Sequence, residues 1–369
     1  MNKFFSALMA LLITLCTSLP AYCGTRTIID MAGRSVKIPD KVERVICSGP
    51  GCLRYLTYLQ GQGMIVGVDS IEHCKTRFDA RPYAIANPQF KNMPLIGEFR
   101  GHDNPELILG LEPQPQVIFK TYKDMGYDPD ELQAKTGIPV VCLSYASLAT
   151  KRDVIYNSLQ LMGDVISKEE RAKAVCDFME KGISDLRART SAIPDNKQKS
   201  CYVGGIAQKG PHGFQSTEPA YPPFHFVNAR NVACPPKGKG KPLQHANVSK
   251  EQIVAWNPEI LFVDISTSQL GENAGAIHEI MTDPAYQSLD AVTADRIFTV
   301  LPYNWYSNNY GSIIADAYYV GKVLYPEHFK DVDPAAKANE IYSFMVGKPV
   351  LKTMDKAFKA KGFQQLELN

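Results

Sequence analysis

Several short loops in this sequence carry residue types that bind anions. Gly49, Pro50 and Gly51 form a tight turn between an apolar segment and an expected helix, where backbone N–H groups can receive an anion. Further along the chain, Arg100 and His102 could bind a carboxylate or an oxyanion through charge-assisted hydrogen bonds. Both patterns also occur in ordinary surface turns. The place of these loops in the fold must therefore decide between the two interpretations.

Other loops are rich in aromatic residues. Tyr303, Asn304 and Trp305 follow an expected strand, and aromatic rings suit a large planar or organic ligand such as a metal chelate. His212 lies in a glycine-rich loop, with Tyr221 close by in the sequence, and could face a cleft as a hydrogen-bond donor or a metal ligand. A lone histidine is more often structural or exposed, so both interpretations of His212 stay open.

A site for a bare metal ion is not expected. Such a site needs several histidine, cysteine or carboxylate ligands that converge. The candidate loops hold such residues only at scattered positions, without ligand spacing: Glu72, His73, His102, His212 and Asp264. Catalytic signatures such as G-x-S-x-G, H-E-x-x-H and the P-loop do not occur in the sequence. We therefore expect a binding protein without a cofactor rather than an enzyme.

The segments that position these loops alternate between apolar strands and helices in both halves of the chain. We expect strands at residues 44–47, 65–68, 117–119, 139–143, 201–203, 260–263 and 296–300. This rhythm predicts an α/β fold with two doubly wound lobes and mostly parallel sheets. Ligands of open α/β sheets lie beyond the carboxyl ends of the strands. The candidates for ligand binding at these ends are Gly49, Pro50, Gly51, Arg100, His102, Tyr122, Tyr145, His212, Tyr221, Tyr303, Asn304 and Trp305.

One long helix is expected between the two halves, at residues 168–190. Apolar residues recur there at steps of three and four from Val175 to Leu186, and Ser167 with Glu170 forms a capping box. At 1.5 Å per residue such a helix spans about 35 Å and would be a rigid connector, although an ordinary surface helix has the same periodicity. We divide the chain into an N-terminal lobe (24–164), a connecting helix (165–193), a C-terminal lobe (194–330) and a helical tail (331–369).

Residues 1–23 have the pattern of a secretory signal peptide. Lys3 precedes an apolar run at residues 4–19, and cleavage is expected before Gly24. The bulky Leu15 and Tyr22, which precede the two cysteines of this segment, argue against a lipid anchor. We therefore expect an exported, periplasmic protein. The net charge of +2 gives no field that would attract nucleic acid or an anionic membrane, so neither is an expected partner.

Removal of the signal peptide leaves seven cysteines, an odd and widely spread set without a C-x-x-C motif. This pattern fits neither a zinc ribbon nor a disulfide-dense scaffold. Cys47 and Cys52 flank a tight loop and could pair.

Two helix starts repeat the same pattern in the two halves. Glu106 and Glu251 each stand seven positions before a proline, Pro113 and Pro258, and each lies in the first turn of an expected helix. A carboxylate is favourable there because of the helix dipole, which is a purely structural explanation. Alternatively, each lobe presents the same charged side chain to a partner with two-fold symmetry.

With these features placed, the sequence resembles the helical-backbone (class III) solute-binding proteins of ABC importers. This clade includes ferric-siderophore, haem and cobalamin binders and has relatives that handle molybdate or tungstate. The resemblance extends from about residue 27 to residue 329. It rests on the order of residues 29–34 (IDMAGR), 39–45 (PDKVERV), 65–69 (IVGVD), 104–106 (NPE) with 111–113 (LEP), 248–251 (VSKE) with 256–259 (WNPE), and 289–292 (LDAV) before 296–298 (RIF).

The resemblance implies that a ligand is held between two lobes joined by one long helix. It also implies that Glu106 and Glu251 dock onto arginines of a membrane permease dimer, which works with an ATPase. The implied function is the capture and delivery of an iron-siderophore-type metal chelate by a monomer. A molybdate or tungstate oxyanion is the alternative ligand, and Arg100, the loop at residues 49–51 and either Arg77 or Arg81 would serve it. A periplasmic metal chaperone or a signalling co-receptor is an alternative of another class.

Two segments depart from the general pattern of this clade. Residues 204–224 are unusually rich in glycine, histidine and aromatic residues, and the tail beyond residue 331 is longer than expected. Both departures suggest a distinct subgroup and leave the identity of the ligand open.

Overall fold

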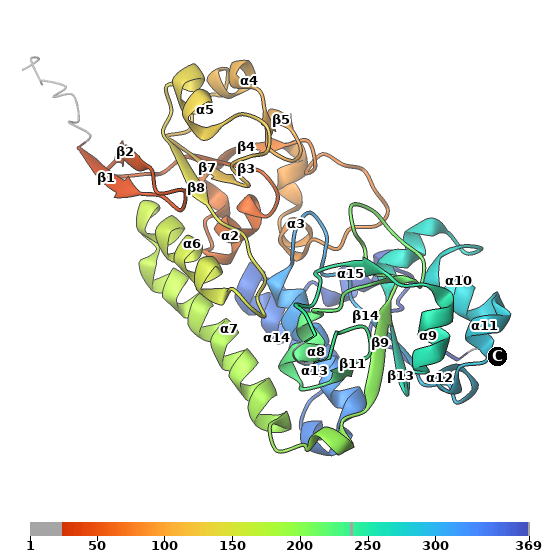
Figure 1. Ribbon diagram of the computed structural model, residues 1–369. Coiled ribbons are helices and arrows are strands. Elements are labelled where there is room, and N and C mark those ends of the chain that lie inside the picture. The colour runs from red at the N-terminus through yellow and green to blue at the C-terminus, as the bar shows by residue number, and fades with distance from the viewer. Residues whose placement is uncertain (1–23, 237–238, 368–369) are drawn as a thin grey trace, which may run out of the picture.

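The computed structural model describes residues 24–236 and 239–367. Two β-sheets form the centres of two lobes, and a long helix runs along one side of both (Figure 1). The expected signal peptide, residues 1–23, lies outside the described residues. Within the described ranges, no helix is both long and apolar enough to cross a membrane.

The first lobe contains a six-stranded sheet in the order β6-β5-β4-β3-β7-β8. All neighbours in it are parallel except β5 and β6. Its strands are β3 (Val45–Ser48), β4 (Ile65–Asp69), β5 (Leu95–Glu98), β6 (His102–Asp103), β7 (Val117–Thr121) and β8 (Val140–Leu143). The helices of this lobe are α2 (Cys52–Tyr58), α3 (Pro82–Ala86), α4 (Pro105–Leu109), α5 (Pro129–Thr136) and α6 (Arg152–Val165). A hairpin of β1 (Thr25–Ile29) and β2 (Ser35–Pro39) precedes them.

The second lobe contains a four-stranded sheet, β11-β9-β13-β14, whose neighbours are all parallel. Its strands are β9 (Ser200–Gly204), β11 (Arg230–Asn231), β13 (Ile260–Asp264) and β14 (Ile297–Val300). A small antiparallel pair, β10 (Ser216–Thr217) and β12 (Ala246–Asn247), lies apart from this sheet. The helices are α8 (Pro222–Phe226), α9 (Lys250–Trp256), α10 (Gly275–Thr282), α11 (Pro284–Gln287), α12 (Asp290–Thr293) and α13 (Tyr310–Leu324). The prediction of two α/β lobes with mostly parallel sheets is confirmed.

The long helix α7 (Glu169–Thr190) runs beside both lobes, as Figure 1 shows. The predicted capping box at its start is wrong. Ser167 has a left-handed backbone (φ 55°) and ends the preceding helix α6, because the N–H of Lys168 bonds to the carbonyl of Gly163 at 2.7 Å. This is the Schellman pattern of a helix C-terminus. Ser167 therefore terminates α6, and Lys168 is the N-cap residue of α7.

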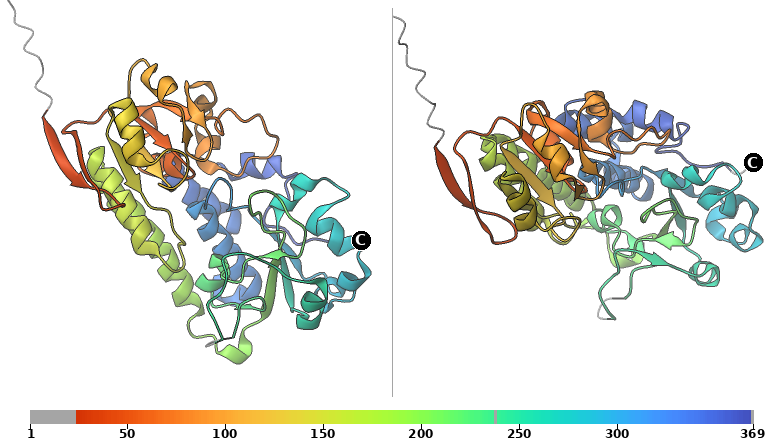
Figure 2. Two further views of the ribbon diagram at one scale, coloured as in Figure 1. Left: turned by 45° about the horizontal axis from the view of Figure 1, so that its top comes forward. Right: turned by 90° about the horizontal axis from the view of Figure 1, so that it is seen from above.

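The C-terminal segment returns to the first lobe. Helix α14 (Pro334–Val346) packs on α13 of the second lobe and also on α2 and α3 of the first, and α15 (Leu351–Ala357) packs on α3. Arg171 of α7 donates to the carbonyl oxygen of Tyr58 at 2.9 Å and to that of Phe344. The blue helices accordingly lie between the lobes in Figures 1 and 2. The lobes are therefore connected by the tail as well as by α7, and the largest cluster of buried apolar residues extends across the boundary, while a smaller cluster lies within each lobe.

The last described residues add an extended segment to the second sheet. The N–H of Leu366 donates to Ile297, and Phe298 forms an antiparallel bridge with Gln365. The expected helical tail thus consists of two helices followed by a strip along the edge of β14. This strip covers backbone N–H and C=O groups of β14 that could otherwise pair with a strand of another chain.

Candidate functional site

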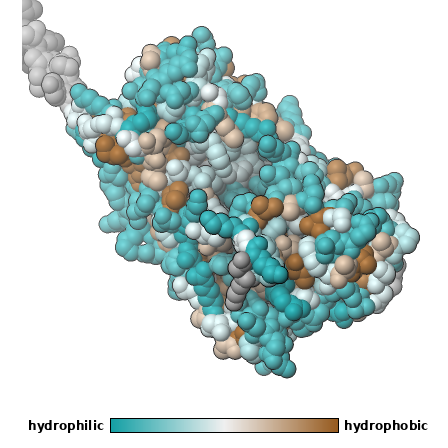
Figure 3. Space-filling view, in the orientation of Figure 1, coloured by the Kyte–Doolittle hydropathy of each residue, from teal (hydrophilic) through white to brown (hydrophobic). Residues whose placement is uncertain are grey.

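A cleft of about 670 Å³ is lined by residues of both lobes. Its walls follow the carboxyl ends of β3, β5, β7 and β14, as the topology of open α/β sheets requires. The face of the molecule in Figure 3 is mainly hydrophilic, with scattered hydrophobic residues. Five of the twelve predicted binding residues line the cleft: Pro50, Arg100, Tyr122, Asn304 and Trp305.

The two glycines beside Pro50 do not line the cleft. Gly49 and Gly51 both have a left-handed backbone, with φ of 87° and 81°. A Cβ on Gly51 would lie 2.4 Å from the ring of Tyr145, so this position needs glycine. The N–H of Cys52 donates to the Gly49 carbonyl at 3.3 Å. The turn therefore uses part of its N–H groups internally, which weakens the predicted anion site.

Three predicted tyrosines point into the protein instead of the cleft. Tyr221 and Tyr303 are buried, with exposed fractions of 1% and 2%, and their ring centroids lie 5.7 Å apart. Tyr303 donates its hydroxyl proton to the carboxylate of Glu218. Tyr145 lies under the cleft, where its hydroxyl donates to the carbonyl of Asn308 at 2.9 Å. These tyrosines support the cleft without lining it.

The two predicted histidines also lie off the cleft. Asp103, the neighbour of His102 in β6, faces inward to Lys120 and Ser48, and because side chains alternate along a strand His102 is exposed. His212 bonds through Nε2 to the carbonyl of Gln208 at 2.8 Å, so this nitrogen is used within its own loop.

One buried arginine ties the two lobes together beneath the cleft. Arg54 of α2 has no exposed surface and reaches the loop that follows β14. Its guanidinium donates to the carbonyls of Trp305, Tyr306 and Asn308 at 2.9–3.0 Å, and to the hydroxyl of Tyr145 at 2.8 Å. Three charge-assisted bonds to one loop fix its position relative to the first lobe.

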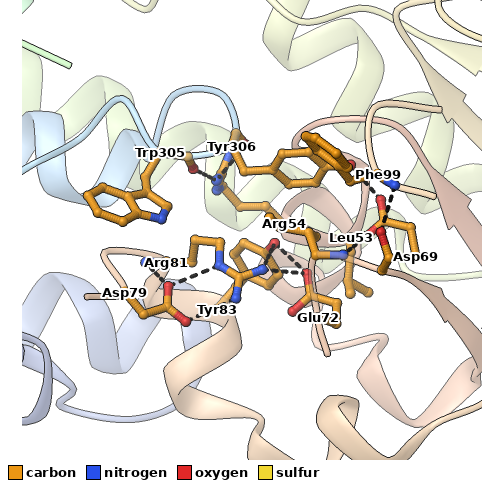
Figure 4. Close-up of polar contacts among 12 residues, drawn as sticks. Leu53, Arg54, Asp69, Glu72, Asp79, Arg81, Tyr83, Phe99, Trp305 and Tyr306 are labelled. Carbon is orange, nitrogen blue, oxygen red and sulfur yellow. Dashed lines mark hydrogen bonds and ion pairs between the residues drawn. The ribbon is translucent and has the colours of Figure 1, made fainter. Parts of the chain in front are cut away.

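Further bonds hold the same loop from the side of the first lobe. Tyr306 donates to the carboxylate of Asp69 and accepts the backbone N–H of Arg100 at 2.9 Å (Figure 4). The hydroxyls of Tyr122 and Ser307 lie 2.8 Å apart. Burial raises the pKa of Asp69 to about 7. Residues 305–308 therefore form a joint between the lobes as well as a wall of the cleft.

A second charged network forms the edge of the cleft in the first lobe. Arg81 is 1% exposed and pairs with Asp79 at 2.9 Å and with Glu72 at 3.1 Å, while Tyr83 donates to Glu72 at 2.6 Å (Figure 4). Arg81 lines the cleft, but its charge is already compensated by two carboxylates. It is therefore a poorer anion ligand than its position suggests.

Two other cations of the cleft are not compensated in this way. Within the described parts of the chain, neither Arg100 of the first lobe nor Lys209 of the second forms an ion pair. The Arg100 guanidinium lies 5.1 Å from the centre of the Phe99 ring. These two side chains place positive charge on opposite walls.

The aromatic wall of the cleft is supported by the tail. The Trp305 ring meets Phe358 edge to face, with 5.7 Å between centroids, and Phe358 lies 5.4 Å from Phe78 of the first lobe. Phe358 has no exposed surface. The segment after α15 thus packs behind the wall formed by Trp305.

Buried acids without cations lie under the wall of the second lobe. Glu218 lines the cleft, and Asp264 and Asp316 lie nearby with exposed fractions of 1% and 0%. Burial raises the pKa of Glu218 to about 8 and that of Asp264 to about 7. One oxygen of Asp316 and the Tyr221 hydroxyl are buried without a hydrogen-bond partner.

The structure offers no cluster of metal ligands in the residues it describes. No three histidine, cysteine, aspartate or glutamate side chains there could hold a metal ion together. All seven cysteines after residue 23 are free thiols, including Cys47 and Cys52, which were expected to be able to pair.

The two predicted docking glutamates lie on the surface. Glu106 is exposed in the first turn of α4, where the side chain of Asn104 accepts the N–H of Leu107 at 3.0 Å. Glu251 is exposed in the first turn of α9, where Ser249 accepts the N–H of Gln252 at 3.3 Å. The two lobes therefore present these carboxylates in the same local setting.

Sequence reasoning missed the residues that hold the cleft together. Arg54 lies in the short helix α2 with no motif around it, and its partners in the second lobe are backbone carbonyls more than 250 positions away. Glu218 stands between two short elements and shows no spacing signal. A charged residue inside an apolar run, as Arg54 is, was the one available hint of a buried ionic contact.

Comparison with known proteins gives a consistent assignment. Residues 55–303 match the family model described as periplasmic binding protein. The molybdate-binding protein MolA of Haemophilus influenzae is 24% identical over 86% of this chain and 90% of its own length. The structure of MolA bound to molybdate superposes with a TM-score of 0.65, 21% identity and coverage of 88% of this chain and 98% of MolA.

Two other solved structures share the fold. A periplasmic solute-binding protein of Veillonella parvula has a TM-score of 0.67 at 17% identity, with 91% of this chain and 97% of that chain covered. Helicobacter pylori CeuE with Ni(II) bound has a TM-score of 0.56 at 14% identity, with 91% and 99% covered. Both the two-lobe fold and the resemblance to helical-backbone binding proteins are thereby confirmed, as is the expectation of a binding protein rather than an enzyme. The chain belongs to the periplasmic binding protein family.

Proposed function

We propose that this protein captures an anionic metal chelate in the cleft and delivers it to the permease of an ABC importer. The observation that carries the proposal is the pairing of two uncompensated cations, Arg100 and Lys209, with an aromatic wall that includes Trp305 and Tyr306. Cations on opposite walls suit an anion, and aromatic faces suit its organic shell.

The size of the cleft favours a chelate over a bare oxyanion. Its volume of about 670 Å³ lies within the range of roughly 300–1,000 Å³ that is usual for drug-sized ligands. A tetrahedral oxyanion has five non-hydrogen atoms and would fill only about 150 Å³, at roughly 30 Å³ for each atom, the share of a water molecule in the liquid. Because Arg54 and its partners fix the loop at residues 305–308, large closure around so small a ligand is disfavoured.

A molybdate or tungstate oxyanion is the second candidate. The similarity to MolA, which binds molybdate, favours it. The cationic side chains at the cleft are of the type that an oxyanion needs, and Arg81 would be available if one of its carboxylate partners moved. Arg77, which was expected to assist, does not line the cleft.

The test of the ligand is native mass spectrometry of the protein purified from its own host, followed by calorimetric titration. We expect an organic metal complex to co-purify, and a ferric tricatecholate to bind the protein more tightly than molybdate does. Trp305→Ala should weaken chelate binding at least tenfold, since loss of a well-packed aromatic contact costs about 1.4 kcal/mol or more. Tight binding of molybdate that is indifferent to this change would favour the oxyanion.

Delivery to a permease is proposed on the basis of Glu106 and Glu251. Both are exposed, one on each lobe, and each could pair with a cation of a two-fold symmetric membrane partner. MolA is described as the cognate periplasmic binding protein of an ABC transporter, which is consistent with such a partner. We place this chain in the periplasm as a monomer, with residues 1–23 as the export signal.

Replacing both glutamates tests the docking. The double variant Glu106→Ala and Glu251→Ala should lose ligand uptake in cells and keep its affinity for the ligand in solution. The exposed pair Glu98→Ala and Glu327→Ala serves as a control for the loss of two surface charges. Full uptake by the docking variant would show that these two glutamates do not mediate docking, whereas uptake that does not require this protein at all would favour a metal chaperone or a signalling co-receptor.

A further inference from the structure

Glu218 is the only acidic side chain of the second lobe that lines the cleft among the residues the structure describes. It is 7% exposed and accepts a hydrogen bond from Tyr303 at Oε2. In the described part of the chain, no group forms a hydrogen bond with its other oxygen, Oε1. This oxygen is also not one of the fully buried atoms that lack a partner. Oε1 is therefore the atom through which this carboxyl group can meet a ligand.

The surroundings of Glu218 are acidic and phenolic. No lysine, arginine or histidine of the described chain forms an ion pair with it. The groups that face it from the packed elements are Tyr303 after β14, Asp264 at the end of β13 and Tyr221 before α8, with Asp316 of α13 behind them. The other charged or titratable nitrogen groups that line the same cleft belong to Lys209, His245, Arg81 and Arg100.

An ionised Glu218 would be poorly placed in this site. Burying a carboxylate without a paired cation is costly, and neighbouring carboxylates cannot all be charged at low dielectric. It would also repel the anion that the proposed function assigns to the cleft. A neutral carboxyl group avoids both problems, because it carries an O–H that can donate to the ligand.

We propose that Glu218 is a specificity-determining residue that stays protonated in the empty cleft and donates a hydrogen bond from Oε1 to an acceptor oxygen of the anionic ligand. This inference rests on the proposed function and names a binding contact for it. The same chemistry is open to a catecholate oxygen and to an oxygen of molybdate. Asp264 favours the protonated state through its proximity, without contact to the ligand.

Burial raises the pKa of Glu218 to about 8, with a further contribution from Asp264, which agrees with this assignment. The direction of the pH effect follows. Below about pH 8 the proton is present and the hydrogen bond forms. Above it, each binding event must also take up a proton, so the affinity should fall about tenfold per pH unit.

The first test reads the protonation of Glu218 without a ligand. The infrared spectrum of the full protein at pH 5–7 should contain the carbonyl band of a buried protonated carboxyl group, which should weaken towards pH 9 and be absent from Glu218→Gln. A Glu218 that is ionised at pH 6 would overturn the inference. This measurement is decisive even if neither probe binds, in which case the proposed function alone fails.

The second test is titration with molybdate and with a ferric tricatecholate over the same pH range. Wild type should lose affinity for its ligand above about pH 8. Glu218→Gln keeps a donor at the same place, so its affinity should stay within about threefold of wild type at pH 6 and should no longer depend on pH in this way. A variant that loses binding at pH 6, or a wild type whose affinity is constant to pH 9, would overturn the inference.

Asp264→Asn separates this role from a structural one. Asp264 does not line the cleft, and an asparagine oxygen can still accept the N–H of Ser266, which Asp264 binds at 2.8 Å. Removing the neighbouring acid should shift the fall in affinity to lower pH while the affinity at pH 5 is retained. An unchanged midpoint would show that the acidic surroundings do not control Glu218.

Discussion

The two lobes treat buried charge in opposite ways. In the first lobe, Arg81 is paired with Glu72 and Asp79, and Lys120 is paired with Asp103 at 2.8 Å with neither side chain more than 2% exposed. In the second lobe, the buried acids at the cleft form no ion pair with any cation of the described residues. One wall of the cleft is therefore held by compensated charges, whereas the other contains acids whose pKa is raised by burial.

This contrast has consequences for how each wall responds to change. A compensated pair is sensitive to the loss of either partner, because the remaining charge stays buried. With an uncompensated buried acid, the free energy of unfolding depends on pH, because the acid binds its proton more tightly in the folded state than in the unfolded state. Asp69 is intermediate, since it belongs to the first lobe but its carboxylate faces Tyr306 of the second.

The largest expected effect is on the compensated wall. Lys120→Met leaves Asp103 buried beside Ser48 without its cation. We expect a loss of about 3–5 kcal/mol in the free energy of unfolding, measured with urea at pH 7. Adding Asp103→Asn should restore a large part of it. If the single and double variants were equally unstable, the charge pair would not be the source of the effect.

The next effect concerns the uncompensated wall. Glu218 and Asp264, with pKa values raised to about 8 and 7, bind protons in the folded state that the unfolded chain releases near pH 4. Their contribution to stability is therefore fully present below about pH 4 and is lost as the pH rises to 8. We expect a decrease of a few kcal/mol in the free energy of unfolding between pH 5 and 8, at about 1.36 kcal/mol per pKa unit.

The control for this pH effect is the double variant Glu218→Gln and Asp264→Asn. Its stability should depend less on pH over the same interval. A wild type that becomes more stable towards pH 8 would mean that the buried acids are ionised, and the contrast between the lobes would fail.

A smaller effect is expected at the joint between the lobes. Arg54→Lys keeps the positive charge but loses the planar fork that binds three carbonyls and Tyr145. We expect a loss of about 2 kcal/mol in unfolding free energy and faster hydrogen exchange of the backbone at residues 305–308.

Arg100→Lys, an exposed position without an ion pair in the described chain, should change stability by less than about 0.5 kcal/mol.

Much of the fold could be predicted from the sequence. Short runs such as residues 45–47 and 260–263 are apolar throughout, so the sheet strands and their parallel arrangement follow from local pattern. The long helix was also visible because its apolar residues recur with the helical period. The residue that caps this helix could not be predicted, because Ser167 terminates the preceding helix instead. Which of the two helices Ser167 belongs to depends on the geometry of the turn between them.

The site was predicted less well, for a physical reason. The rule that ligands lie at the carboxyl ends of strands selects loops, and five of the predicted residues do line the cleft. It does not say which way a side chain faces. Tyr303 and Trp305 are two positions apart, yet Tyr303 points inward to Glu218 and Trp305 forms the wall, because the loop is held by Arg54 from the other lobe. Contacts across so many residues leave no local trace in the sequence.

The return of the last helices to the first lobe affects how this protein is made. The surfaces of α2 and α3 that α14 and α15 cover lie more than 240 residues earlier in the chain. When only the first lobe has been synthesised, the apolar surface of α2 and α3 is therefore exposed. It stays exposed until α14 and α15 have been synthesised and can pack on it. Formation of the native state is thus tied to completion of the polypeptide, and a chain cut short before residue 334 would be a substrate for chaperones and proteases.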